Sequence, residues 1–238
     1  EQYDASKYLC YAFRRKGDLH KTEQMPLGNM NGGFPFKING IKFHTSESAY
    51  ICGLFSDNTE KHQMIQKLLV EETNGYAAKK KIRGAYKGEG RKDWESFNIE
   101  WMLYVVWQKV QGNKEFRDIL MEIPEGATII ENSTFHKKSV PDTAAFWGCR
   151  NQSMKDFHTI VGKYVSALNP TSDAEKDRMV SAYMNDFCNH GIFEGNNEMG
   201  KILMIVKKCL HDGTEPQIDY ELLKSKNIYL MGQSVFSE

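Results

Sequence analysis

Apolar residues recur at the spacing of an α-helix in most of the long segments of this 238-residue chain. The clearest helical segment is 93–111, where one face collects Trp94, Phe97, Trp101, Met102 and Val105. Similar stripes occur over about 197–210, over 152–168 and from Ser172 onward. Because such amphipathic segments must bury their apolar faces against other elements, we expect a mostly helical core.

Short strands should accompany these helices near the N-terminus and in the middle of the chain. Residues 8–14 and 34–45 have the composition of strands, and Asn39-Gly40 predicts a hairpin turn within the second because both residues tolerate positive φ. The other expected elements are helices from Ser46, over about 59–72 and over about 74–83, and a buried strand at 127–131. The expected fold class is α+β and predominantly α-helical.

The composition excludes several classes of protein. Forty per cent hydrophobic and 12% aromatic residues indicate a folded core, and 31 basic residues balance 31 acidic ones, which argues against broad binding of nucleic acid. Five scattered cysteines without a CxxC pair indicate neither a disulfide framework nor a zinc ribbon. With no signal segment and no apolar run of about 20 residues, we expect a soluble cytoplasmic protein without membrane contacts.

Common catalytic motifs are missing from the sequence. It contains no Walker A loop, GxGxxG, GxSxG or HExxH, and His44 with Glu47 provides too few ligands for a metal site. Polar and aromatic groups instead gather at the expected junctions between elements, where a rigid scaffold can hold side chains toward a cleft. These groups are the candidates for function.

Their order along the chain carries a specific resemblance. The motifs are Phe13-Arg14-Arg15, Pro26-Leu27-Gly28-Asn29, Gly40-Ile41-Lys42-Phe43-His44-Thr45-Ser46-Glu47-Ser48-Ala49-Tyr50, Arg91-x-Asp93-Trp94, Lys109-x-Gln111-x-Asn113, Ile129-Ile130-Glu131, Trp147-Gly148-Cys149 and Gly195-x-Asn197-x-Met199-Gly200. In this order they resemble the NADAR family, which includes the YbiA-like proteins. The resemblance covers about residues 10–210, apart from a helical hairpin at 151–192.

The resemblance implies one YbiA-like domain over 1–238, with 151–192 as an inserted hairpin. It also implies an N-glycosidase that cleaves a base-type group from a ribose phosphate or ADP-ribose, such as an ADP-ribosylated base or a riboflavin-pathway-like intermediate. No metal and no cofactor is expected. The expected partner is this small-molecule substrate, with ADP-ribosylated nucleic acid as a further candidate; the oligomeric state is left open.

The resemblance also implies roles for single residues. Glu47 would stabilise positive charge at the anomeric carbon and orient water, and Trp94 would stack on the leaving base. The family's second carboxylate would fall on Ala144, so either Asp142 replaces it or it is absent. The implied substrate-binding residues are Arg14, Asn29, Tyr50, Arg91, Trp147, Gly148, Gly195 and Asn197, with Arg14 and the helix after Gly195 suited to phosphate.

Each role has a structural alternative. Glu47 could serve the helix dipole, and Trp94 could be a core residue. Arg91 and Asp93 could be an exposed pair at a helix start, and the segment at Gly195 could be a capped helix start. The inserted hairpin could be a lid that selects larger substrates, or a buttress or oligomer surface. For the whole protein the alternatives are a non-catalytic sensor of ADP-ribose or NAD-like nucleotides, and a nucleic-acid-associated repair factor.

Overall fold

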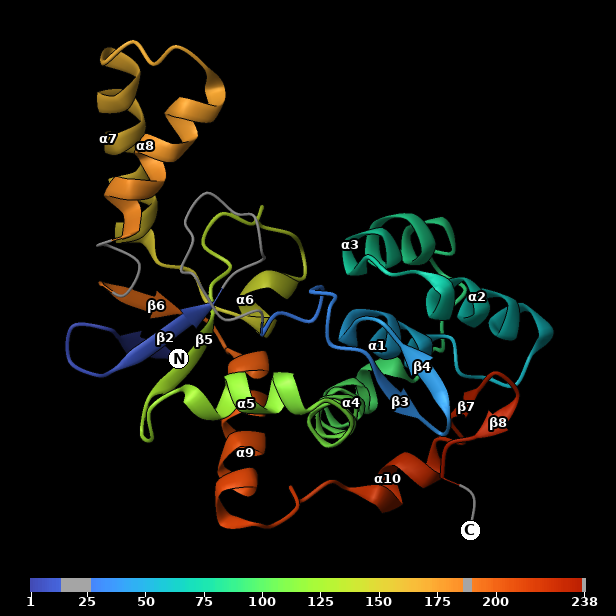
Figure 1. The fold of residues 1–238 in the computed structure, drawn as a ribbon. Coiled ribbons are helices and arrows are strands. Elements are labelled where there is room, and N and C mark those ends of the chain that lie inside the picture. Colours follow the sequence, from blue (N-terminus) through green and yellow to red (C-terminus); the bar gives the residue numbers. More distant parts are fainter. Residues whose placement is uncertain (14–26, 186–189, 237–238) are drawn as a thin grey trace. The chain divides into compact units, whose positions relative to one another are not determined.

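The computed structural model describes residues 1–13, 27–185 and 190–236 (Figure 1). The chain forms two compact units. Unit 1 comprises Glu1–Gly28 and Glu122–Met204, and unit 2 comprises Asn29–Met121 and Ile205–Glu238. Within the described ranges, every helix is too short or too polar to span a lipid bilayer. The predicted Arg14 site lies outside the described residues.

Unit 1 contains two strand pairs that join distant parts of the sequence. Strand β1 (Gln2–Asp4) pairs antiparallel with β6 (Ile192–Glu194), and β2 (Cys10–Phe13) pairs parallel with β5 (Thr128–Glu131). The strand predicted at 127–131 is therefore confirmed as β5. Helix α6 (Thr143–Trp147) follows β5, and α9 (Glu198–Asp212) begins after β6.

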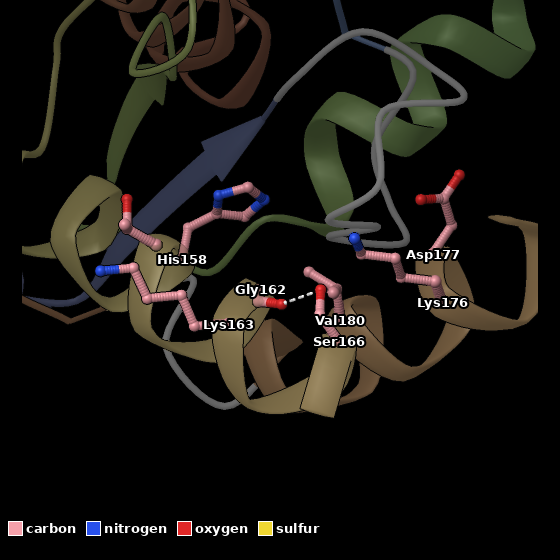
Figure 2. A pocket seen from close by; sticks show the side chains of 8 residues that line it. His158, Gly162, Lys163, Ser166, Lys176, Asp177 and Val180 are labelled. Carbon is pink, nitrogen blue, oxygen red and sulfur yellow. Dashed lines mark hydrogen bonds between the residues drawn. The ribbon is translucent and has the colours of Figure 1, made fainter. Parts of the chain in front are cut away.

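The helical hairpin of unit 1 consists of α7 (Gln152–Ala167) and α8 (Asp173–Asn185), at the two predicted positions. Its buried face joins the core formed by the strands, because Met154, Val161, Val165, Val180 and Met184 pack in one cluster with Cys10, Ile130 and Phe193. The hairpin therefore has a packing role in unit 1. A hollow of about 560 Å³ also runs along it, lined by His158 and Lys163 from α7 and by Lys176 and Asp177 from α8 (Figure 2).

Unit 2 begins with the predicted hairpin. Strands β3 (Phe36–Ile38) and β4 (Ile41–Phe43) pair antiparallel around Asn39 and Gly40, both at positive φ. The helical elements that follow are α1 (Ser46–Leu54), α2 (Glu60–Glu71), α3 (Gly75–Ala77), the π-helix η1 (Ala78–Arg83), the 3₁₀-helix η2 (Trp94–Ser96), α4 (Asn98–Gly112) and α5 (Lys114–Glu122). The C-terminal part adds α10 (Tyr220–Ser225) and a small hairpin of β7 (Tyr229–Leu230) and β8 (Gln233–Ser234).

Two helices differ from their predictions. The helix expected at 74–83 is π-helical from Ala78 to Arg83. The segment 93–111 is not a continuous helix, because η2 ends at Ser96 and Phe97, with a φ of −145°, interrupts the helical backbone before α4 begins. The apolar stripe is nevertheless buried as expected, and Trp101 in α4 donates from Nε1 to the carbonyl oxygen of Ala49 in α1 at 3.2 Å. The fold class is α+β and mostly helical, as predicted.

Candidate active site

Glu47 lies in the first turn of α1, at the end of the loop that follows the β3–β4 hairpin. Thr45 caps this helix, its hydroxyl oxygen accepting from the backbone N–H of Ser48 at 3.1 Å. Glu47 itself donates its backbone N–H to the carbonyl oxygen of Asn29 at 3.0 Å. The residue is only 5% exposed, and Nζ of Lys79 in η1 lies 4.0 Å from Glu47 Oε1. A carboxylate is thus held nearly out of water on a rigid element.

Two predicted aromatic residues lie close to Glu47: Tyr50, three residues further along α1, and Trp94 of η2. Tyr50 and Trp94 are in ring contact, with centroids 4.9 Å apart, and Trp94 also meets Phe97 edge-on at 5.2 Å. Burial raises the pKa of the Tyr50 hydroxyl, the Glu47 carboxylate raises that pKa further, and Arg83 opposes the shift. Trp94 is 3% exposed, so it is a core residue whatever else it does.

Asn29 lies close to Glu47 through the backbone contact already described. Its side-chain amide donates from Nδ2 to the sulfur of Met102 in α4 at 3.5 Å. Asn29 therefore connects the loop before β3 to both α1 and α4. The predicted group of Asn29, Glu47, Tyr50 and Trp94 is brought together in unit 2, while the substrate-binding and catalytic roles of these residues stay predictions.

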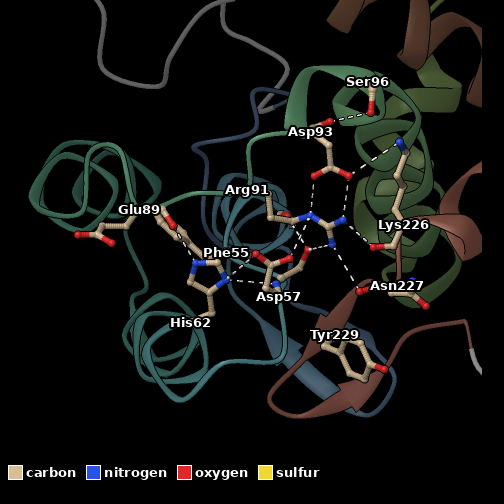
Figure 3. A network of polar contacts seen from close by, with 12 residues as sticks. Phe55, Asp57, His62, Glu89, Arg91, Asp93, Ser96, Lys226, Asn227 and Tyr229 are labelled. Atoms are coloured by element: carbon tan, nitrogen blue, oxygen red, sulfur yellow. Dashed lines mark hydrogen bonds and ion pairs between the residues drawn. The ribbon is translucent and has the colours of Figure 1, made fainter.

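Arg91, also predicted to bind substrate, is held by a network of protein groups (Figure 3). Its guanidinium donates to both oxygens of Asp93 at 3.0 Å and to the carbonyl oxygen of Lys226 at 2.6 Å. A further hydrogen bond runs to the hydroxyl of Ser56 at 3.2 Å. The Arg91 hydrogen bonds lower the pKa of the Asp93 carboxyl, so this pair is ionised and fixes the loop that carries Trp94.

A buried lysine that contacts Ser46, the residue before Glu47, was not given a role from the sequence. Lys109 in α4 is 0% exposed, and its Nζ donates to the hydroxyl of Ser46 at 3.1 Å. The ammonium also lies 4.0 Å from the centre of the Phe116 ring. Burial lowers the pKa of Lys109 to about 7. The helix-end motif Lys109-x-Gln111-x-Asn113 contained this residue. The sequence alone does not show, however, that the lysine side chain points into the core.

The remaining candidates belong to unit 1. Asp142 caps α6, and Arg150 donates to its Oδ1 from Nη2 at 2.9 Å. This hydrogen bonding to Arg150 lowers the pKa of Asp142, so its carboxylate is ionised and suited to accept rather than donate a proton. Trp147, the last residue of α6, is half-buried and meets Phe146 edge-on at 5.4 Å.

Gly148, Gly195 and Asn197 pack closely in the backbone of unit 1. A Cβ on Gly148 would lie 2.3 Å from the carbonyl oxygen of Glu131, and one on Gly195 would lie 2.3 Å from that of Gly148. Asn197 donates from Nδ2 to the carbonyl oxygen of Ile129 at 2.8 Å and accepts the backbone N–H of Glu131 at 3.1 Å. Close packing of the protein itself therefore accounts for these three residue types, and their predicted binding roles stay predictions.

The candidate residues are divided between the two units. Glu47 and Trp94 belong to unit 2, whereas Asp142 and Trp147 belong to unit 1. That both indoles and both carboxylates face one pocket remains a prediction from sequence. Among the described residues, no three His, Cys, Asp or Glu side chains are grouped closely enough to hold a metal ion.

Comparisons with known proteins identify the fold. No family model matches the chain, and no curated protein matches it. Among solved structures, the chain is similar to the NMR structure of the E. coli protein YbiA, with a TM-score of 0.51 and 18% sequence identity. The match covers 86% of this chain and 88% of the other. At this identity the similarity shows the fold, which agrees with the YbiA-like architecture expected from the motifs.

Proposed function

We propose that this protein hydrolyses the N-glycosidic bond between a base-type group and a ribose phosphate or ADP-ribose, without a metal or cofactor. The observation that carries the proposal is the position of Glu47. Its carboxylate is nearly excluded from water in the first turn of α1, next to the Tyr50–Trp94 ring pair. An anion in such a site interacts more strongly with developing positive charge than it would in water.

The chemistry follows from this environment. As the bond from C1′ to the base nitrogen breaks, the ribose gains oxocarbenium character, and the Glu47 carboxylate stabilises that charge. The same carboxylate orients a water molecule, whose oxygen forms the new bond to C1′ while its proton passes to the departing base or to solvent. Asp142 stays the sequence-based candidate for a second carboxylate; ionised beside Arg150, it is suited to accept a hydrogen bond or a proton and not to act as the acid.

The sensor remains the second candidate function. One observation favours it: Trp94 exposes only 3% of its surface, which leaves little of the indole for stacking on a base. A protein of this kind would bind an ADP-ribose-like nucleotide and release it unchanged.

Substitution of Glu47 by glutamine tests the enzyme. The protein is incubated with ADP-ribosylated guanine, a ribosylaminopyrimidine phosphate or NAD, in the presence of EDTA, and the released base is measured. We expect turnover by the wild type and a decrease in kcat of about 10²–10⁴-fold in Glu47→Gln, because the amide carries no charge. The matched control is Glu60→Gln, which removes an exposed acid from the first turn of α2 and should leave kcat unchanged.

The outcomes separate the candidates. Wild-type protein that binds these compounds without releasing a base supports the sensor. Equal rates for the wild type and Glu47→Gln would exclude Glu47 as the catalytic carboxylate, and loss of turnover in EDTA would exclude a metal-free reaction.

A further inference from the structure

The segment 75–92 is strongly basic in a chain whose net charge is zero. It contains a single acid, Glu89, and the basic residues Lys79, Lys80, Lys81, Arg83, Lys87, Arg91 and Lys92. Four of these basic residues belong to the π-helix η1, which packs against α1. π-Helical turns are rare and occur frequently at functional sites. The charge is therefore concentrated beside the helix that carries Glu47.

Two of these cations lie on the side of η1 that faces the candidate site. Lys79 Nζ is 4.0 Å from Glu47 Oε1. Arg83 follows four residues later, slightly less than one turn of a π-helix, so both side chains leave the same face. The charges of Arg83 and Glu47 both act on the Tyr50 hydroxyl, which places Arg83 near the same group of residues. Lys80 and Lys81 leave η1 at other angles and are exposed.

These cations keep most of their hydrogen-bonding capacity. At 4.0 Å, Lys79 is at the outer limit of an ion pair with Glu47, and no hydrogen bond joins them. Arg83, Lys80 and Lys81 form no ion pair with any residue in the described part of the chain. Arg83 is half-buried, and within the described ranges no carboxylate lies within ion-pair distance of it. A charge in this state favours an anionic ligand.

We propose that Lys79 and Arg83 bind the phosphate group of the substrate next to Glu47. The inference rests on the proposed function, which requires a ribose phosphate or ADP-ribosyl group at this carboxylate. A phosphate brought close to an ionised glutamate is repelled unless cations lie between or beside them, and η1 supplies two. The guanidinium can bind two phosphate oxygens at once, and the ammonium adds a point charge.

The test compares two double substitutions that remove the same charge from η1. Lys79→Met with Arg83→Met removes the proposed phosphate ligands, and Lys80→Met with Lys81→Met is the matched control. Each protein is assayed for hydrolysis of a ribose-phosphate N-glycoside and of the corresponding unphosphorylated nucleoside. We expect the ratio of the two kcat/KM values to fall about 10- to 100-fold in the first variant and to stay near the wild-type ratio in the control.

Measurements of ligand binding test the phosphate site without requiring turnover. Isothermal titration with ADP-ribose, and separately with inorganic pyrophosphate, should show a loss of affinity of the same size in Lys79→Met/Arg83→Met alone. That result supports the phosphate site even if no protein hydrolyses any substrate, an outcome that would contradict only the proposed reaction. Equal losses in both double variants, unchanged affinity in the first, or no binding to the wild type would overturn the inference.

Discussion

At the scale of single residues, Lys109 is the most unusual side chain of unit 2. Its ammonium lies among Ser46, Phe34 and Phe116, with no exposed surface. Burial lowers its pKa to about 7 from an ordinary value of 10.5. Between these two pH values the unfolded chain binds more protons at this position than the folded protein does. Lys109 therefore makes the free energy of unfolding rise with pH across this window. Its destabilising effect on the fold is greatest below pH 7.

Replacing Lys109 by methionine should remove this pH dependence. We expect Lys109→Met to raise the free energy of unfolding by about 1–4 kcal/mol near pH 7, because the variant buries no charge. The gain should shrink by up to about 1.4 kcal/mol for each pH unit above 7. Urea unfolding at pH 6.5, 7.5 and 8.5 measures both effects.

The control for this measurement is Lys37→Met, because Lys37 is exposed on β3. It should leave both the stability and its pH dependence near those of the wild type. A Lys109→Met protein that is less stable than the wild type at every pH would show that the Ser46 hydrogen bond outweighs the cost of burying the amine.

At the scale of elements, Asn197 connects the start of α9 to β5. Its side-chain amide bonds to Ile129 and Glu131, and its backbone carbonyl accepts the N–H of Lys201. The side chain thus forms hydrogen bonds with β5 of the kind that a neighbouring strand would form. The backbone carbonyl of Asn197 accepts a hydrogen bond at the start of α9. This arrangement explains an asparagine at that position without reference to a ligand.

Substitution of Asn197 by alanine should destabilise unit 1 by about 2–4 kcal/mol, because the half-buried N–H of Glu131 and the buried carbonyl of Ile129 each lose a partner. Asn197 also has a positive φ of 55°, which alanine tolerates less well. Urea unfolding measures the change, and Asn196→Ala, at an exposed neighbour, should fall within about 0.5 kcal/mol of the wild type. A loss below about 1 kcal/mol in Asn197→Ala would mean that other groups satisfy β5.

Elements specified by local patterns were predictable from the sequence. The Asn39-Gly40 hairpin, α1, the two helices of the 151–192 hairpin and α9 all follow from turn residues, caps or apolar stripes. Strands β1, β6, β7 and β8 are two or three residues long and exist only through their partners, so no periodicity reveals them. The π-helix was predicted only as a helix, because the sequence of such a short segment does not distinguish i→i+5 from i→i+4 hydrogen bonding.

The candidate site was predictable to a similar degree. The motifs indicated Asn29, Glu47, Tyr50 and Trp94, which the structure brings together in unit 2. The alternative pairing of Arg91 with Asp93 was also foreseen, but the hydrogen bond from Arg91 to Lys226 was not, because that partner lies more than a hundred residues away. Lys109 and Arg83 were missed for the same reason, since burial depends on what the rest of the chain places around a helix.

At the scale of the whole molecule, unit 2 is assembled from two distant stretches of sequence. Arg91 is one of several polar connections between them and donates to the backbone carbonyl oxygens of Lys226 and Asn227. The backbone N–H of Tyr229 adds a hydrogen bond to the carbonyl oxygen of Ser56 at 3.0 Å. The C-terminal segment is thereby fixed to the loop that leads to Trp94.

Loss of the Arg91 side chain should loosen the C-terminal segment before the rest of unit 2. In Arg91→Met we expect amide hydrogen exchange at Tyr229 and Val235 to become about 10–100-fold faster, because the variant loses hydrogen bonds from a charged donor that stabilise the segment. Exchange at Trp101 and Val105 in α4 should stay slow. Lys92→Met, at the exposed neighbour, is the control; similar acceleration in both variants would show that the segment does not depend on Arg91.

The pairing of β1 with β6 has a consequence for synthesis on the ribosome. Residues 2–4 emerge well before residues 192–194, with which they pair, and residues 29–121 wait for those beyond 205. At about 5–20 residues per second, the second delay lasts roughly 4–17 s. During that time the apolar faces of α1 and α4 lack the C-terminal residues that cover them in the folded protein.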